Sequence, residues 1–183
     1  MAPTGVLLIN TGSPDSPEVA DVRRYLNQFL MDERVLDAPA PLRRILVSGF
    51  ILPFRPKRSA AAYRSIWWDE GSPLVVLSQR LAQALQTELD PPVALGMRYG
   101  NPAIGPAVQH LLAAGVSRIV LVPLFPHYAM STVQSAIEEA ERVLARSRAA
   151  VTLAVLPPFY REPAYIDALA QSAAPYLAQG YDH

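Results

Sequence analysis

The chain has 183 residues, of which 51% are hydrophobic and 17% are charged, a composition typical of globular proteins. Its 16 basic and 16 acidic side chains cancel, which argues against nucleic acid as a partner because no net field attracts a polyanion. There is no cysteine, which excludes disulfides and thiolate metal sites. The amino terminus lacks a signal-peptide pattern, and no apolar run approaches the ~20 residues of a membrane span. We therefore expect a cytoplasmic protein.

Four short apolar runs predict buried strands: Gly5 to Ile9, Val93 to Met97, Arg118 to Val122 and Val151 to Leu156. A turn containing proline or glycine, and then a segment with helical periodicity, follows each run. This alternation of strand and helix predicts an α/β domain with a four-stranded parallel sheet and right-handed crossovers.

The stretch between the first two strands is too long for a minimal crossover and predicts a helical insertion at about residues 17–90. Helical patterns occur near Pro41 to Phe50, Arg58 to Trp67 and Pro73 to Leu89. Between Asp37 and Asp69 there are six basic residues and no acidic one, interleaved with aromatic side chains. This segment is either a solvated basic face over a small satellite core, or a cationic, aromatic lip for an apolar dianion or an anionic bilayer.

The carboxyl ends of parallel strands meet at one edge of a sheet, where open α/β folds bind their ligands. The sequence places there Asn10-Thr11-Gly12, Arg98-Tyr99-Gly100, Pro126-His127-Tyr128 and Phe159-Tyr160. An arginine, a histidine and several tyrosines on one rim suit a flat aromatic ligand with acidic substituents. Pro14 interrupts the loop after the first strand, which argues against a dinucleotide site.

Five strings spread over the chain match one family in the same order. They are VLLINTGSP from Val6, YLNQFLMDERV from Tyr25, YRSIWWDEGSPL from Tyr63, ALGMRYGNP from Ala94 and VPLFPHYAMSTVQS from Val122. Together they resemble the N-terminal half of the ferrochelatases. The resemblance implies that residues 1–183 form a single flavodoxin-like (chelatase-like) three-layer α/β/α lobe of a two-lobe enzyme.

The resemblance also implies an activity for the complete protein, the insertion of ferrous iron into protoporphyrin IX to make haem. The partners would be protoporphyrin IX, Fe²⁺ and a missing C-terminal lobe, and no cofactor would be tightly bound. The family's metal-handling histidine and its partner glutamate come after the position where this chain stops. We therefore expect no catalytic residue in the chain and no iron insertion by the chain alone.

The residues that match family positions around the porphyrin are Thr11, Leu30, Met31, Tyr63, Ser72, Arg98, Tyr99 and Tyr160. Apolar residues at Leu30 and Met31 favour protoporphyrin IX over more carboxylated porphyrins. Ser72 also has a structural explanation as the N-cap of the helix that begins at Pro73. His127 is a candidate for contact with the metal, with a solvated histidine at a strand tip as the alternative.

Three other functions stay open. A non-catalytic flavodoxin-like module would bind a flavin or another phosphate ligand through Thr11-Gly12-Ser13. An interaction domain would dock on a membrane through the basic aromatic insertion. A related chelatase would act on another tetrapyrrole or metal, such as cobalt.

Overall fold

The computed structural model describes residues 2–178. Met1 and residues 179–183, at the two ends of the predicted lobe, lie outside this range. Four strands form one sheet in the order β2-β1-β3-β4, and all neighbouring strands are parallel. Their bounds are β1 Thr4–Ser13, β2 Val93–Gly100, β3 Arg118–Pro123 and β4 Thr152–Val155. The predicted four-stranded parallel sheet is confirmed.

Strands β1 and β2 are longer than the apolar runs predicted, because they continue to pair through Gly12 with Tyr99 and through Ser13 with Gly100. Gly12 has φ 99°, and a Cβ atom there would lie 1.8 Å from the carbonyl oxygen of Tyr99. Only glycine permits this close approach. Because Gly12 and Ser13 pair with β2, the Thr11-Gly12-Ser13 segment is strand and not a free loop. Arg98 and Tyr99 likewise lie inside β2 and not beyond it.

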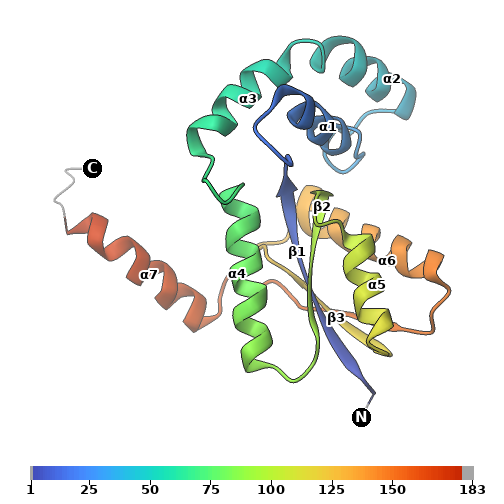
Figure 1. Ribbon diagram of the computed structural model, residues 1–183, viewed down its shortest axis with the longest axis vertical. Helices are drawn as coiled ribbons and strands as arrows, with labels where there is room; N and C mark the ends of the chain where they lie inside the picture. Colours follow the sequence, from blue (N-terminus) through green and yellow to red (C-terminus); the bar gives the residue numbers. More distant parts are fainter. Residues whose placement is uncertain (1, 179–183) are drawn as a thin grey trace.

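Four α-helices and one π-helical turn connect β1 to β2. They are α1 Val19–Leu30, α2 Ala40–Ile45, the π-helical η1 Leu46–Ile51, α3 Arg55–Ile66 and α4 Pro73–Glu88. The helix expected near Pro41 to Phe50 is therefore α2 continued by η1. Helices α1, α2 and α3 gather beyond the carboxyl ends of the strands, whereas α4 runs beside the sheet (Figure 1). The insertion between β1 and β2 is called the lip below. Its predicted limits, about residues 17–90, stay a prediction.

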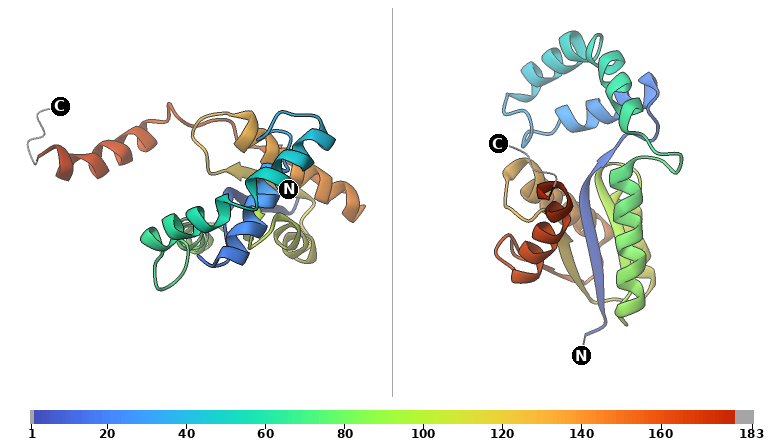
Figure 2. Two further views of the ribbon diagram at one scale, coloured as in Figure 1. Left: turned by 90° about the horizontal axis from the view of Figure 1, so that it is seen from above. Right: turned by 90° about the vertical axis from the view of Figure 1, so that its left-hand side faces the viewer.

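The remaining helices follow the other three strands. They are α5 Ile104–Ala113, η2 Met130–Gln134, α6 Ser135–Ser147 and α7 Pro163–Leu177. Helices α5 and α6 pack on one face of the sheet, where a cluster of buried side chains includes Leu7, Ile9 and Leu121. Helix α4 packs on β1 and β2 on the other face, and these layers make the flavodoxin-like α/β/α lobe that the sequence predicted (Figure 2).

A second core lies under the insertion. Val22, Leu26 and Leu30 of α1 are buried there against Val47 and other side chains of the following helices. Tyr99 of β2 is 2% exposed and belongs to the same cluster, so the sheet itself supplies part of this core. Within residues 2–178 no helix is both long and apolar enough to cross a membrane.

Candidate functional site

The parallel sheet brings the predicted rim residues to one edge. Thr11 and Arg98 lie near the ends of neighbouring strands β1 and β2, and His127 and Tyr160 follow the ends of β3 and β4. Thr11 is half-buried, and its backbone N–H donates a hydrogen bond to Asn10 Oδ1 at 2.8 Å. The topology that the sequence argument required is therefore present.

The guanidinium group of Arg98 is bound inside the chain. Its Nη2 donates to Asp32 Oδ2 at 2.6 Å, and its Nε donates to the hydroxyl and carbonyl oxygens of Ser135 at 2.7 and 3.0 Å. The side chain of Asp32 is 5% exposed and that of Arg98 is 21% exposed, so the ion pair is largely out of water. Removing either partner would leave a poorly solvated charge, which makes this pair a structural joint between the insertion and the sheet.

Tyr99 completes the same joint. Its hydroxyl donates to Asp32 Oδ2 at 2.7 Å, and its ring meets Phe29 edge to face at a centroid distance of 5.3 Å. Burial raises the pKa of the Tyr99 hydroxyl, so it stays protonated as a donor. Burial also opposes ionisation of Asp32, but hydrogen bonds from Ser135, Tyr99 and the Arg34 N–H, with the charge of Arg98, hold the Asp32 pKa below its ordinary value.

Sequence reasoning missed Asp32 and Ser135. Both lie inside the strings that carried the family resemblance, and a largely buried arginine requires an acidic partner, so a signal was available. The predicted role of Arg98 as a porphyrin ligand stays a prediction. The bonds to Ser135 and Asp32 use its Nε and Nη2.

His127 and Tyr160 stack at the other end of the rim. Their ring centroids lie 5.0 Å apart with an interplanar angle of 14°, and the Arg161 guanidinium carbon lies 5.4 Å from the Tyr160 ring centroid. His127 is exposed, and Tyr160 is 38% exposed. Nowhere in residues 2–178 do three or more histidine or carboxylate side chains gather as a metal site would require.

Leu30, Met31 and Tyr63 lie in the insertion. Leu30 is buried in its core, whereas half-buried Met31 lines a hollow of about 570 Å³ between α1 and α2. Tyr63 is half-buried, with its ring edge to face against Tyr25 and Trp67 at 6.3 and 6.2 Å. Burial raises the pKa of the Tyr63 hydroxyl.

Ser72 occupies the N-cap position of α4, as predicted, but its side chain makes no capping hydrogen bond. The backbone carbonyl of Ser72 accepts the first helical bond, from Val76 N–H at 2.9 Å. Ser72 is 7% exposed and borders a polar hollow of about 170 Å³ that Asp15 and Asn101 also line. The position is confirmed, whereas the side-chain cap is not formed.

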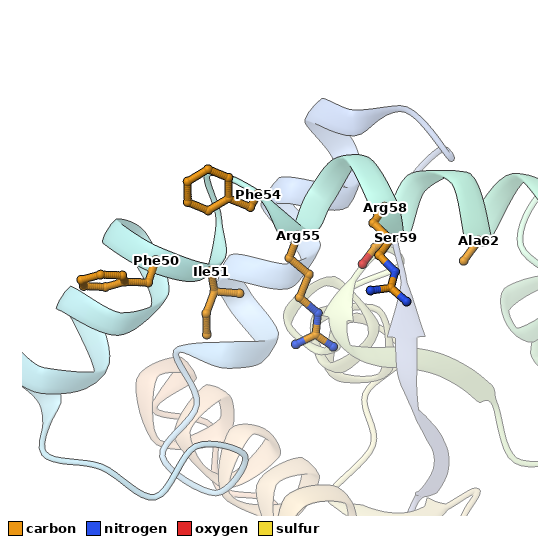
Figure 3. Close-up of a pocket in the computed structure, with 7 residues that line it drawn as sticks. All are labelled: Phe50, Ile51, Phe54, Arg55, Arg58, Ser59 and Ala62. Atoms are coloured by element: carbon orange, nitrogen blue, oxygen red, sulfur yellow. The ribbon is translucent and has the colours of Figure 1, made fainter.

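A hollow of about 680 Å³ lies in the lip, between η1 and α3. Its lining residues are Phe50, Ile51, Phe54, Arg55, Arg58, Ser59 and Ala62. The side chains of Arg55 and Arg58, one helical turn apart, point to the same side of α3 (Figure 3). Neither guanidinium lies within 4.0 Å of a carboxylate of the described residues, in contrast to Arg98.

This hollow combines two unpaired guanidinium groups with an apolar wall. Guanidinium forks bind carboxylates, and exposed phenylalanine rings offer surface to a flat apolar ligand. The charge imbalance of the insertion pointed to this surface, but the sequence did not distinguish Arg55 and Arg58 from the other four basic residues of the segment.

Comparison with known proteins gives the family. The model of the family Ferrochelatase matches residues 3–182. The chain is 56% identical over 184 positions to a ferrochelatase of Azotobacter vinelandii and 57% identical to one of Ectopseudomonas mendocina. Each alignment covers 100% of this chain and 54% of the relative, so the chain spans about half the length of the curated relatives it matches. The chain belongs to the ferrochelatase family.

Proposed function

We propose that this chain is the N-terminal, porphyrin-binding half of a lyase that inserts ferrous iron into protoporphyrin IX in haem biosynthesis. The observation that carries the proposal is the pair of unpaired arginines, Arg55 and Arg58, beside the apolar lip hollow. Protoporphyrin IX is a flat apolar ring with two propionates. The lip offers two cations and an apolar wall, which is the complementary arrangement.

The buried joint would hold the lip in place for this task. Asp32 follows α1 and binds Arg98 and Tyr99 of β2, so the helices of the lip are fixed against the sheet edge. A binding group that is fixed before the ligand arrives loses less entropy on binding. Arg98 acts in this proposal mainly as a positioning residue, whereas Arg55 and Arg58 face the propionates.

The reaction exchanges two protons for one metal ion. Two pyrrole N–H groups lose their protons as Fe²⁺ enters, which balances the charge of the product. Groups that accept these protons would lie in the remaining half of the protein, and strain on the ring, supported by binding at its periphery, would expose the nitrogen lone pairs. Contact of iron with the exposed His127 belongs to this proposal as well, with ferrous iron as substrate and no tightly bound cofactor.

Titration of the 183-residue chain with protoporphyrin IX, followed by anaerobic addition of Fe²⁺, tests this proposal. We expect a saturable change in the porphyrin absorption band and no haem spectrum. Absence of porphyrin binding would contradict the binding role. Catalytic haem formation by this chain would contradict the assignment of the proton acceptors to the remaining half.

A second role for the lip is peripheral contact between a cytoplasmic protein and an anionic membrane. Leu42, Ile45 and Phe54 are 48%, 59% and 77% exposed along the basic segment that includes Arg43 and Arg44. Apolar side chains beside cations favour the headgroup region of an anionic bilayer. Co-sedimentation with phosphatidylserine vesicles would support this membrane contact if it disappears at 0.5 M salt, which is on the order of the ionic strength that screens surface charge. Equal binding to neutral vesicles would contradict it.

A further inference from the structure

One face of the β-sheet is only partly covered by the described chain. Ile119 and Leu121 of β3 point to the α5 and α6 side, so the alternating Val120 and Val122 point to the opposite face. Both valines stay only partly buried. Helix α4 lies over β1 and β2 on this face, and α7, which follows β4, extends away from the sheet and buries none of its residues (Figures 1 and 2).

A groove runs between α4 and the exposed part of this face. Its hollow of about 390 Å³ is lined by Asn10, Leu74, Leu77, Ser78, Leu81 and Leu124. Leu77 is 53% exposed and Leu81 is 41% exposed, and both line the hollow together with Asn10 of β1 and Leu124 after β3. The polar groups at the groove floor are already satisfied, since Asn10 Nδ2 donates to Ser78 Oγ at 3.1 Å. The open surface is therefore apolar.

A wholly parallel sheet is stable when both of its faces are covered. Here α4 covers β1 and β2 on this face, whereas no helix of the described residues covers β3 beside it. A second copy of this chain would bring an equally half-covered sheet face, so joining two copies would not supply the missing helix.

The relatives supply the candidate for the occupant. This chain covers 54% of the Azotobacter vinelandii ferrochelatase, so 100 − 54 = 46% of that protein lies outside the matched half. We propose that an amphipathic helix from this remaining half packs into the groove between α4 and β3, against Leu77, Leu81 and Leu124. The proposal rests on the assignment of the chain as one half of a ferrochelatase, but not on where porphyrin binds.

The absence of cysteine from the chain permits a direct test. Leu77→Cys introduces one thiol in the groove, and Leu42→Cys introduces one at a similarly exposed leucine of α2, at 48% against 53%. Each variant is prepared as the 183-residue chain and as the same chain joined to the remaining half of the Azotobacter vinelandii relative. Alkylation by iodoacetamide is followed by mass spectrometry of the peptide that carries residue 77 or residue 42.

We expect residue 77 to react at least tenfold more slowly in the joined protein than in the 183-residue chain, and residue 42 to react equally in both. Equal rates at residue 77 would overturn the proposal. Slow labelling of residue 77 already in the 183-residue chain would also overturn the proposal, because α7 or a second copy would then occupy the groove. A labelling rate that depends on protein concentration would indicate the second copy, and one that does not would indicate α7.

A second measurement separates this proposal from the proposed function. Leu77→Glu with Leu81→Glu should lower the melting temperature of the joined protein by several degrees and leave that of the 183-residue chain nearly unchanged, since both leucines are exposed there. Protoporphyrin binding by the 183-residue chain should not change. An unchanged joined protein would contradict the docked helix and leave the porphyrin site untouched.

Discussion

The Asp32 carboxylate binds the Arg98 guanidinium at 2.6 Å and so joins the end of helix α1 to strand β2, 66 residues further along the chain. This contact connects the two cores of the lobe. One core lies between the sheet and helices α5 and α6, and the other lies under the lip. The position of the lip over the sheet edge therefore depends on a buried ion pair as well as on apolar packing.

Replacement of Asp32 by asparagine tests this joint. Asp32→Asn keeps the size of the side chain but leaves Arg98 without a counter-charge, and breaking a buried pair costs about 3 kcal/mol at the low end of its usual range. We expect the free energy of unfolding in urea to fall by about that amount. Asp69→Asn, at an exposed aspartate, is the control and should change stability by less than about 0.5 kcal/mol. Equal stability of the two variants would contradict the joint.

The joint also predicts how stability depends on pH. The Asp32 pKa in the folded chain lies below its ordinary value of 3.8, so the unfolded chain takes up the proton first as the pH falls. The contribution of Asp32 is therefore complete above about pH 5 and is lost as the pH falls through the folded pKa, below 3.8. The stability difference between the wild type and Asp32→Asn should shrink over this range in urea titrations. A difference that grows on acidification would reverse the assigned sign.

Gly12 provides a test of the longer strand pairing. Gly12→Ala would place a methyl group 1.8 Å from the Tyr99 carbonyl oxygen at a residue with φ 99°, so β1 and β2 would have to separate at their ends. We expect a loss of about 3 kcal/mol or more, measured by urea unfolding. Gly105→Ala in α5, where a Cβ atom meets nothing within 4 Å, should be neutral or stabilising. A tolerated Gly12→Ala would mean that the strands separate before this residue.

Much of the fold was predictable because its signals are local. Apolar runs and helical periodicity gave the four parallel strands and the helices that follow them. Strand ends were less accurate, because Thr11 to Ser13 and Arg98 to Gly100 carry polar side chains or glycine and join the sheet only by pairing with each other.

The candidate site was less accessible to sequence reasoning. Arg98 stood out as an arginine after an apolar strand, but its partner Asp32 is 66 residues away, and single-sequence patterns do not report such contacts. For the lip arginines, the sequence indicated the segment but not the individual residues. Their segment was evident from its charge, yet only the folded chain shows that Arg55 and Arg58 line the hollow, whereas Arg64 of the same helix lies 3.7 Å from Glu18.

The most direct test of porphyrin binding at the lip compares two ligands and two proteins. Protoporphyrin IX and its dimethyl ester share one ring, but only the first carries carboxylates, and the proteins are the wild type and Arg55→Gln/Arg58→Gln. Quenching of Trp67 and Trp68, the two tryptophans of the chain, reports binding. Arg146→Gln, at an exposed arginine of α6, is the control.

We expect the wild-type chain and the Arg146→Gln control to prefer the free acid by about tenfold, equivalent to about 1.4 kcal/mol from charge-assisted hydrogen bonds. The double variant should bind both ligands with nearly the affinity of the wild type for the ester. An equal preference for the free acid in the double variant and in the wild type would place the propionates elsewhere and contradict the account.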